Sequence, residues 1–171
     1  MIRAALLLSC LAQPSQAALV HFCWVGATGY TMTGSMEFPD ALLDAPVVTE
    51  ADVTRFRIAG FRDGAPIGTW DAGAREPDDT WYLRFFPETM TFPTNGEVLG
   101  PFDQGWNADG TARDCDKDEW GFNAGGYAQD FCLGGEWIEE SGVPPQKPFV
   151  AQWEPPDDPE CAGPALLSKR R

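Results

Sequence analysis

Apolar and polar residues alternate along several short segments of the chain. Successive side chains of a β-strand point to opposite faces, so this alternation is typical of strands that are buried on one side. In residues 30–38, one face carries Tyr30, Met32, Gly34, Met36 and Phe38, and the other carries Thr31, Thr33, Ser35 and Glu37. Residues 53–61 alternate in the same way, with Phe56 and Ile58 opposite two arginines. Both segments are therefore predicted to be half-buried strands.

Turn residues connect further predicted strands. Asp63-Gly64 predicts a hairpin turn that leads into a strand at residues 67–71. Gly134-Gly135 predicts a second hairpin, whose strands span residues 127–133 and 136–139. Apolar or aromatic runs predict three more strands, of which the first is fully buried, at residues 20–25, 80–86 and 149–153.

Long irregular connections separate these strands. The chain contains 18 Gly and 15 Pro, and residues 101–119 are expected to form a loop. Thr49 with Asp52 three residues later is a weak capping box and predicts one helical turn, but no longer helical periodicity occurs. Many short strands separated by connections rich in glycine and proline predict an all-β fold. We expect an antiparallel β-sandwich or open barrel with long loops and a disulfide-pinned hairpin.

The N-terminus has the layout of a bacterial secretory signal peptide. Arg3 precedes an apolar run, and the small-residue site Ser15-Gln16-Ala17 follows it. We predict a signal at residues 1–17, a β-domain at residues 18–153 and a loosely ordered tail, rich in proline and acids, at residues 154–171. The expected location is secreted or periplasmic. An alternative is a lipoprotein signal with Cys10 as the lipidated residue.

Four cysteines remain after the predicted signal: Cys23, Cys115, Cys132 and Cys161. An even number in an exported chain indicates disulfides, with three possible pairings. We favour Cys115 with Cys132, because the glycines between them allow the chain to double back. That choice leaves Cys23 with Cys161. A zinc site is disfavoured, because there is no C-x-x-C pair and His21 is the only histidine.

The formal net charge of −14 limits the partners of this protein. A chain this acidic repels the phosphates of nucleic acids and of anionic membranes, so neither is an expected partner. The apolar run near the N-terminus is too short for a membrane span. The negative charge serves either solubility or cation binding.

A calcium site is one hypothesis for the acidic stretch that begins at Asn107. Asn107-Ala108-Asp109-Gly110 copies the middle of an EF-hand loop. In that register Gly105 takes the first position and Asp116 the twelfth, so the two most informative ligands are missing. A looser calcium loop and a solvated acidic loop remain as alternatives. The candidate calcium ligands are Asn107, Asp109, Asp114 and Asp116, and no other cofactor is expected.

A saccharide site is a second hypothesis. Sugars present C–H faces to aromatic rings and hydroxyls to amides and carboxylates, and three tryptophans lie next to such groups in the sequence. The candidate residues are Trp106 with Asn107, Trp120 with Asn123, and Trp137 with Glu136. The alternative is that these rings pack in the core or over a disulfide.

Hydrolysis by paired carboxylates is a third hypothesis. Such chemistry needs one carboxyl with a raised pKa and a second one at a set distance. The candidates are Glu119, Asp130 and Glu136, which flank aromatic residues that would desolvate them. His21 lies in an apolar run and is expected to be a core imidazole. No catalytic motif is present, so no catalytic residue is assigned.

Residues 31–71 carry a resemblance to known proteins. TGSMEFPDALL and VTEADVTRFRIAGFRDGAPIGTW resemble the strands of secreted β-rich bacterial proteins of unknown function, many of which carry a PEP-CTERM sorting signal. That signal and its apolar anchor are absent at residues 164–171. The resemblance implies export and a β fold, and it supplies no site residues.

These observations favour a binding or structural module for a saccharide or an extracellular matrix polymer. The alternatives are a secreted hydrolase that uses carboxylates and a calcium-dependent surface protein.

Overall fold

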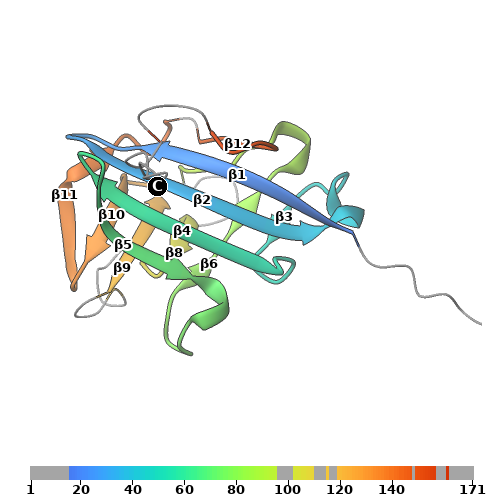
Figure 1. The fold of residues 1–171 in the computed structure, drawn as a ribbon, viewed down its shortest axis with the longest axis horizontal. Coiled ribbons are helices and arrows are strands. Elements are labelled where there is room, and N and C mark those ends of the chain that lie inside the picture. Colours follow the sequence, from blue (N-terminus) through green and yellow to red (C-terminus); the bar gives the residue numbers. More distant parts are fainter. Residues whose placement is uncertain are drawn as a thin grey trace, which may run out of the picture.

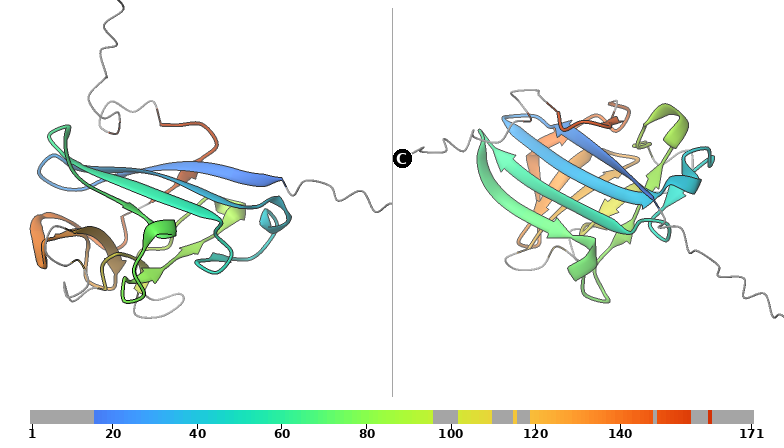
Figure 2. Two further views of the ribbon diagram at one scale, coloured as in Figure 1. Left: turned by 60° about the horizontal axis from the view of Figure 1, so that its bottom comes forward. Right: turned by 45° about the vertical axis from the view of Figure 1, so that its right-hand side comes forward.

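The computed structural model describes residues 16–95, 102–109, 115, 119–147, 149–156 and 161. Two five-stranded antiparallel sheets pack face to face, as Figures 1 and 2 show. The first sheet has the order β12 (Ala151–Gln152), β1 (Ala17–Val25), β2 (Tyr30–Pro39), β4 (Arg55–Arg62), β5 (Ala65–Asp71). The second has the order β11 (Glu136–Val143), β10 (Gln129–Leu133), β9 (Trp120–Gly125), β8 (Phe102–Trp106), β6 (Trp81–Tyr82). The prediction of an all-β sandwich is confirmed.

Short elements connect the two sheets. β3 (Val48–Thr49) pairs with β7 (Arg84–Phe85) in a small sheet of its own. Three 3-10 turns follow strands, namely η1 (Asp40–Leu42), η2 (Ala72–Ala74) and η3 (Pro87–Thr89). In the part of the chain that the structure describes, no helix is long and apolar enough to cross a membrane.

The alternating segments form strands as predicted. In β2 the apolar side faces the core, with Tyr30, Met32, Met36 and Phe38 buried. Asp63 and Gly64 take φ values of 50° and 76°, the left-handed conformation of a tight hairpin turn between β4 and β5. Gly134 and Gly135 make the corresponding turn between β10 and β11, with φ values of 60° and 83°.

Four local predictions are wrong. β1 is not fully buried, because it alternates and turns His21 outward. Residues 80–86 do not form one strand: buried Leu83 separates β6 from β7, and these belong to different sheets. Residues 101–119 are not all loop, since they contain β8, and β9 follows them as a buried strand without alternation. Residues 50–52 form a turn instead of a helical turn.

Trp106 lies at the centre of the hydrophobic core. Its ring centroid is 4.7 Å from that of Phe56 in the first sheet and 5.0 Å from that of Phe122 in the second. Phe92 and Phe149, from irregular segments, pack against it at 5.7 and 5.9 Å. One side chain of β8 therefore joins both sheets and the connections that close the end of the sandwich.

Two glycines let the second sheet approach the first closely. Gly60 of β4 and Gly68 of β5 are directly opposite each other in the register. The indole of Trp120 lies against both, and a Cβ atom at either position would overlap it. The absence of side chains at these two positions thus allows β9 to pack against β5.

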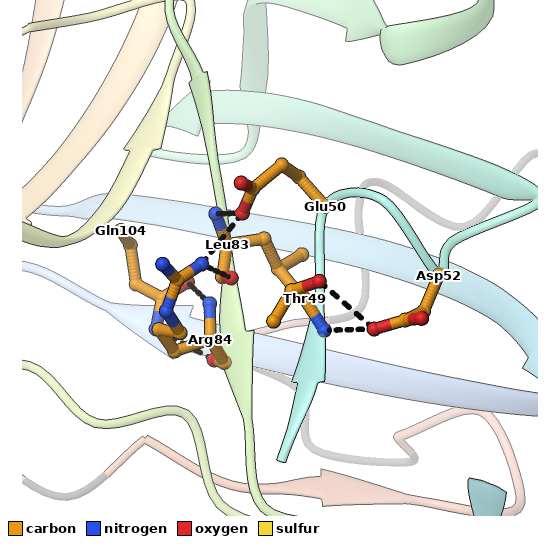
Figure 3. A network of polar contacts seen from close by, with 6 residues as sticks. All are labelled: Thr49, Glu50, Asp52, Leu83, Arg84 and Gln104. Atoms are coloured by element: carbon orange, nitrogen blue, oxygen red, sulfur yellow. Dashed lines mark hydrogen bonds and ion pairs between the residues drawn. The ribbon is translucent and has the colours of Figure 1, made fainter. Parts of the chain in front are cut away.

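A polar network fixes β7 between the sheets (Figure 3). Glu50 Oε2 accepts hydrogen bonds from Leu83 N at 3.1 Å and from Arg84 Nη1 at 2.6 Å. Gln104 is fully buried, and its Nε2 donates to the carbonyls of Arg84 at 2.8 Å and Pro93 at 2.9 Å. These bonds satisfy backbone groups that regular sheet pairing leaves free.

Thr49 and Asp52 keep one of the two hydrogen bonds of the predicted capping box, from Thr49 N to the Asp52 carboxylate, while Asp52 N donates to Thr49 O and not to its hydroxyl. Thr49 N and Oγ1 donate to Asp52 Oδ2 at 2.9 and 2.8 Å (Figure 3). The prediction found the correct contact. It gave the wrong element, because the chain continues as a bend after Asp52.

Both favoured disulfides are present. Cys115 and Cys132 have Cα atoms 6.0 Å apart, and Cys23 and Cys161 have Cα atoms 5.9 Å apart. Disulfides persist in oxidising compartments, which places this chain outside the cytoplasm. Cys161 is buried, so the predicted loose tail is tied to β1 at this residue. Cys10 and the predicted signal, except for its last two residues, lie outside the described part.

We expect Gly68→Ala to destabilise the fold by about 1–3 kcal/mol, the usual cost of overpacking a core. The nearest atom to the new methyl group is Cβ of Trp120, which is attached to the backbone and cannot swing away. Urea unfolding of the oxidised protein measures the effect. Gly126→Ala is the matched control, because its new Cβ would meet only Asn95 O at 3.6 Å. Equal losses in both variants would contradict the packing account.

Candidate functional site

Polar side chains form a row across the outer face of the first sheet. The register pairs His21 with Ser35, Ser35 with Arg57, and Arg57 with Asp71. Gln152 of β12 extends the row beyond His21. Directly opposite residues of antiparallel strands are near neighbours. The row therefore crosses all five strands at right angles to the chain.

A second row of smaller side chains runs beside the first. Here the register pairs Cys23 with Thr33, Thr33 with Ala59, and Ala59 with Thr69. Within the described part of the chain, the hydroxyls of Thr33, Ser35 and Thr69 make no hydrogen bond. Together the two rows present hydroxyl, imidazole, guanidinium and carboxylate groups on one surface.

A groove of about 1130 Å³ lies over these two rows. One wall comes from η2 and the loop after it, with Ala74, Glu76 and Asp79. Pro155, Pro156 and the disulfide-bonded Cys161 line another part. Beyond the edge of β5 the lining continues onto the second sheet, at Asn107, Glu119 and Trp120. The volume lies near the upper end of the range of pockets that bind small molecules.

An ion pair lies in the floor of the groove. Arg57 Nε donates to Asp71 Oδ2 at 2.5 Å, and Gly73 N donates to Asp71 Oδ1 at 2.9 Å. Burial raises the pKa of the Asp71 carboxyl, but these two bonds together with the positive charges of Arg57 and Arg55 outweigh burial and bring the pKa below its ordinary value. Asp71 is therefore ionised at neutral pH and holds the guanidinium of Arg57 in place.

The predicted tryptophan site is not assembled on the surface. Trp106 and Trp120 are 0% and 2% exposed, so neither presents a ring face to a sugar. Trp137 is half-buried and packs with Ala108 against the Cys115–Cys132 disulfide. The alternative interpretation of these rings, packing in the core and over a disulfide, is the correct one.

The polar candidates are dispersed. Asn107 lines the groove, with Nδ2 donating to Glu119 Oε2 at 3.3 Å and to Trp120 O at 3.1 Å. Asn123 is buried on the outer face of the second sheet, and Glu136 is exposed at the start of β11. Of the six residues predicted to bind a ligand, only Asn107 and Trp120 belong to the groove lining.

The calcium hypothesis is only partly open to inspection. Asp114 and Asp116 lie outside the described residues. Among the residues that are described, no group of three or more acids, cysteines or histidines is placed to hold a metal ion. Asn107 has a φ of 53° and uses its amide to hold the start of the loop against β9.

Asp130 is the candidate carboxyl with the most altered environment. It lies in β10 opposite Asn123, whose Nδ2 donates to Asp130 Oδ1 at 3.5 Å. Burial raises the pKa of Asp130 to about 6, and the hydrogen bond from Asn123 opposes this shift only in part. Asp130 does not line the groove, and neither does Glu136.

Sequence reasoning missed most of the groove residues as a site. The alternation of β2 and β4 placed Thr33, Ser35 and Arg57 on polar faces, which the structure confirms. The alternation could not predict which residues of neighbouring strands lie opposite each other, and it is this register that forms the two rows. His21 was expected in the core, but it is half-buried and lines the groove, because β1 alternates from Ala17 onward.

Comparisons of this chain with known protein families, with curated proteins and with solved structures find no match. The resemblance of residues 31–71 to secreted β-rich proteins thus stays a prediction.

The raised pKa of Asp130 should make stability depend on pH. The native state keeps the proton at pH values where the unfolded chain releases it, so this stabilisation is complete below about pH 4 and is lost as pH rises through about 6. The free energy of unfolding of the wild type minus that of Asp130→Asn should fall by about 2 kcal/mol between pH 4 and pH 7, allowing for partial solvent exposure. Urea titrations measure it. The pKa of Asp71 is lowered from 3.8, so the corresponding difference for Asp71→Asn should be flat over this range and should fall as pH drops below about 4. A flat difference for Asp130→Asn would contradict the assignment.

Proposed function

We propose that this chain is a secreted or periplasmic bacterial binding module, and that the groove over the first sheet holds a saccharide or a matrix polymer. The observation that carries the proposal is the pair of in-register rows, which set hydroxyls and a fixed Arg57–Asp71 pair along the floor of one groove. Sugars are recognised by such arrays of donors and acceptors.

The floor of the groove supports this proposal through its polarity. A hydroxyl donates and accepts, and the Asp71 carboxylate accepts, so the floor offers both functions to a sugar ring. Arg57 supplies further donors in a fixed orientation. The strands beneath are paired on both sides in β1, β2 and β4, which gives these groups a rigid support.

The positions of the carboxyls favour binding over catalysis. A hydrolase needs two carboxyls on either side of one bond, one of them with a raised pKa. Asp130 has a raised pKa, but it belongs to the second sheet and is not part of the groove lining. A carboxylate-dependent hydrolase is therefore the less supported proposal. A calcium-dependent surface role would depend in part on Asp114 and Asp116, which lie outside the described residues.

Replacing two groove hydroxyls should weaken saccharide binding without unfolding the protein. A glycan array and pull-down with insoluble polysaccharides identify a bound sugar, and calorimetry then compares Thr33→Val/Thr69→Val with the wild type. Each lost hydrogen bond is worth about 1 kcal/mol, so the double variant should bind roughly 30-fold more weakly. Valine keeps the β-branched shape that suits a strand.

Thr31→Val is the matched control, because Thr31 lies on the same face of β2 outside the groove. It should bind like the wild type. No binding across the array, or equal loss in Thr31→Val and in the double variant, would contradict the proposed site.

A further inference from the structure

The groove runs across the strands of the first sheet. Four strands that lie side by side form its floor, namely β1 with His21, β2 with Ser35, β4 with Arg57 and β5 with Asp71 (Figure 1). Neighbouring strands are about 4.8 Å apart, so the floor from β1 to β5 is about 14 Å long. Beyond β5 the lining continues onto Trp120 of the second sheet. The groove therefore suits a ligand that lies across the strands and is longer than one sugar ring.

The floor is narrow on the two central strands. Its lining there consists of residues 33–35 of β2 and residues 57–59 of β4. The first and last residue of each stretch face outward, and residues two positions apart on a strand are about 7 Å from each other. Across β2 and β4 the floor is therefore a strip that is about half as wide as it is long. A chain-like ligand fits this strip when its long axis lies across the strands.

Polar groups recur at each strand along this strip. The first row presents an imidazole on β1, a hydroxyl on β2, a guanidinium on β4 and a carboxylate on β5. The second row adds the hydroxyls of Thr33 on β2 and Thr69 on β5. A ligand whose repeat matches the strand spacing can offer a hydroxyl to every strand. An extended peptide advances only about 3.3 Å per residue, so its polar groups would not keep step with the strands.

We propose that the groove binds an extended β-1,4-linked glycan chain that crosses the four strands, with one sugar unit over each strand. The inference rests on the proposed saccharide function and names the linkage. A β-1,4 link joins equatorial positions on opposite sides of a glucose ring, so the chain is straight and its unit length is close to the strand spacing. An α-1,4-linked glucose chain curves, so its hydroxyls move away from a straight floor after a few units.

Two glucose hexamers that differ only in linkage test this selectivity. Calorimetry compares cellohexaose, which is β-1,4-linked, with maltohexaose, which is α-1,4-linked. Cellohexaose should bind at least tenfold more tightly. Equal affinity, or tighter binding of maltohexaose, would overturn the inference and leave the saccharide function standing. If neither hexamer binds, the inference is overturned, and the glycan array decides separately whether the saccharide function survives.

The dependence of affinity on chain length tests the direction of the ligand. Affinity should rise at each step from cellobiose to cellotetraose, because each added unit reaches another strand of the floor. From cellopentaose to cellohexaose it should change less than threefold. An affinity that is already constant from cellobiose onward would overturn the arrangement across four strands.

A bulky side chain in the middle of the strip should block the chain. Ala59 lines the groove and lies between Thr33 and Thr69 in the second row. Ala59→Phe should weaken the binding of cellohexaose at least tenfold. Thr31→Phe is the matched control, because it adds the same ring to the same face of the sheet outside the groove lining, and it should bind within twofold of the wild type. Equal losses would overturn the proposal, and the linkage comparison tests it on the wild type even if Ala59→Phe does not fold.

Discussion

The contact of Trp120 with Gly60 and Gly68 is the constraint on which the arrangement of the two sheets depends. The indole fills the space that side chains would occupy at this cross-strand pair, so β9 lies directly under β5. Packing at this distance leaves no room for even a methyl group between ring and backbone. The two sheets therefore meet along the β5 edge, and their relative position is set there.

The groove is a consequence of this contact. Because β9 is held against β5, the segment before β9 brings Glu119 next to the outer face of a sheet to which it does not belong. Asn107 is held at the same place, because its side-chain amide donates a hydrogen bond to the carbonyl oxygen of Trp120. A buried packing contact thus places two polar groups beside the hydroxyl rows of β2 and β5. The core and the site share one structural cause.

This coupling explains what the sequence could and could not predict. Alternation identified the faces of β2 and β4, and the turn residues at Asp63-Gly64 and Gly134-Gly135 gave two hairpins. Those signals are local. The groove depends on register across four strands and on the approach of β9 to β5, which no single segment contains. Trp106 and Trp120 were candidates for a surface site with core packing as the alternative, and the sequence could not decide between them, because a tryptophan can lie next to an amide both in a sugar site and in a core strand. His21 was wrongly predicted to lie in the core, because its neighbours in β1 are apolar on both faces and the alternation of the strand is not visible in the sequence.

The two disulfides have different surroundings on the two sheets. Each ties an irregular segment to an outward-facing cysteine, Cys132 on β10 and Cys23 on β1. On the second sheet, Ala108 and Trp137 fill the space around the disulfide and make a small apolar cluster. On the first sheet, Pro155, Pro156 and Cys161 line one part of a space of about 1130 Å³ that remains open over polar side chains. One disulfide therefore lies under apolar packing on the second sheet, and the other borders a polar groove on the first sheet.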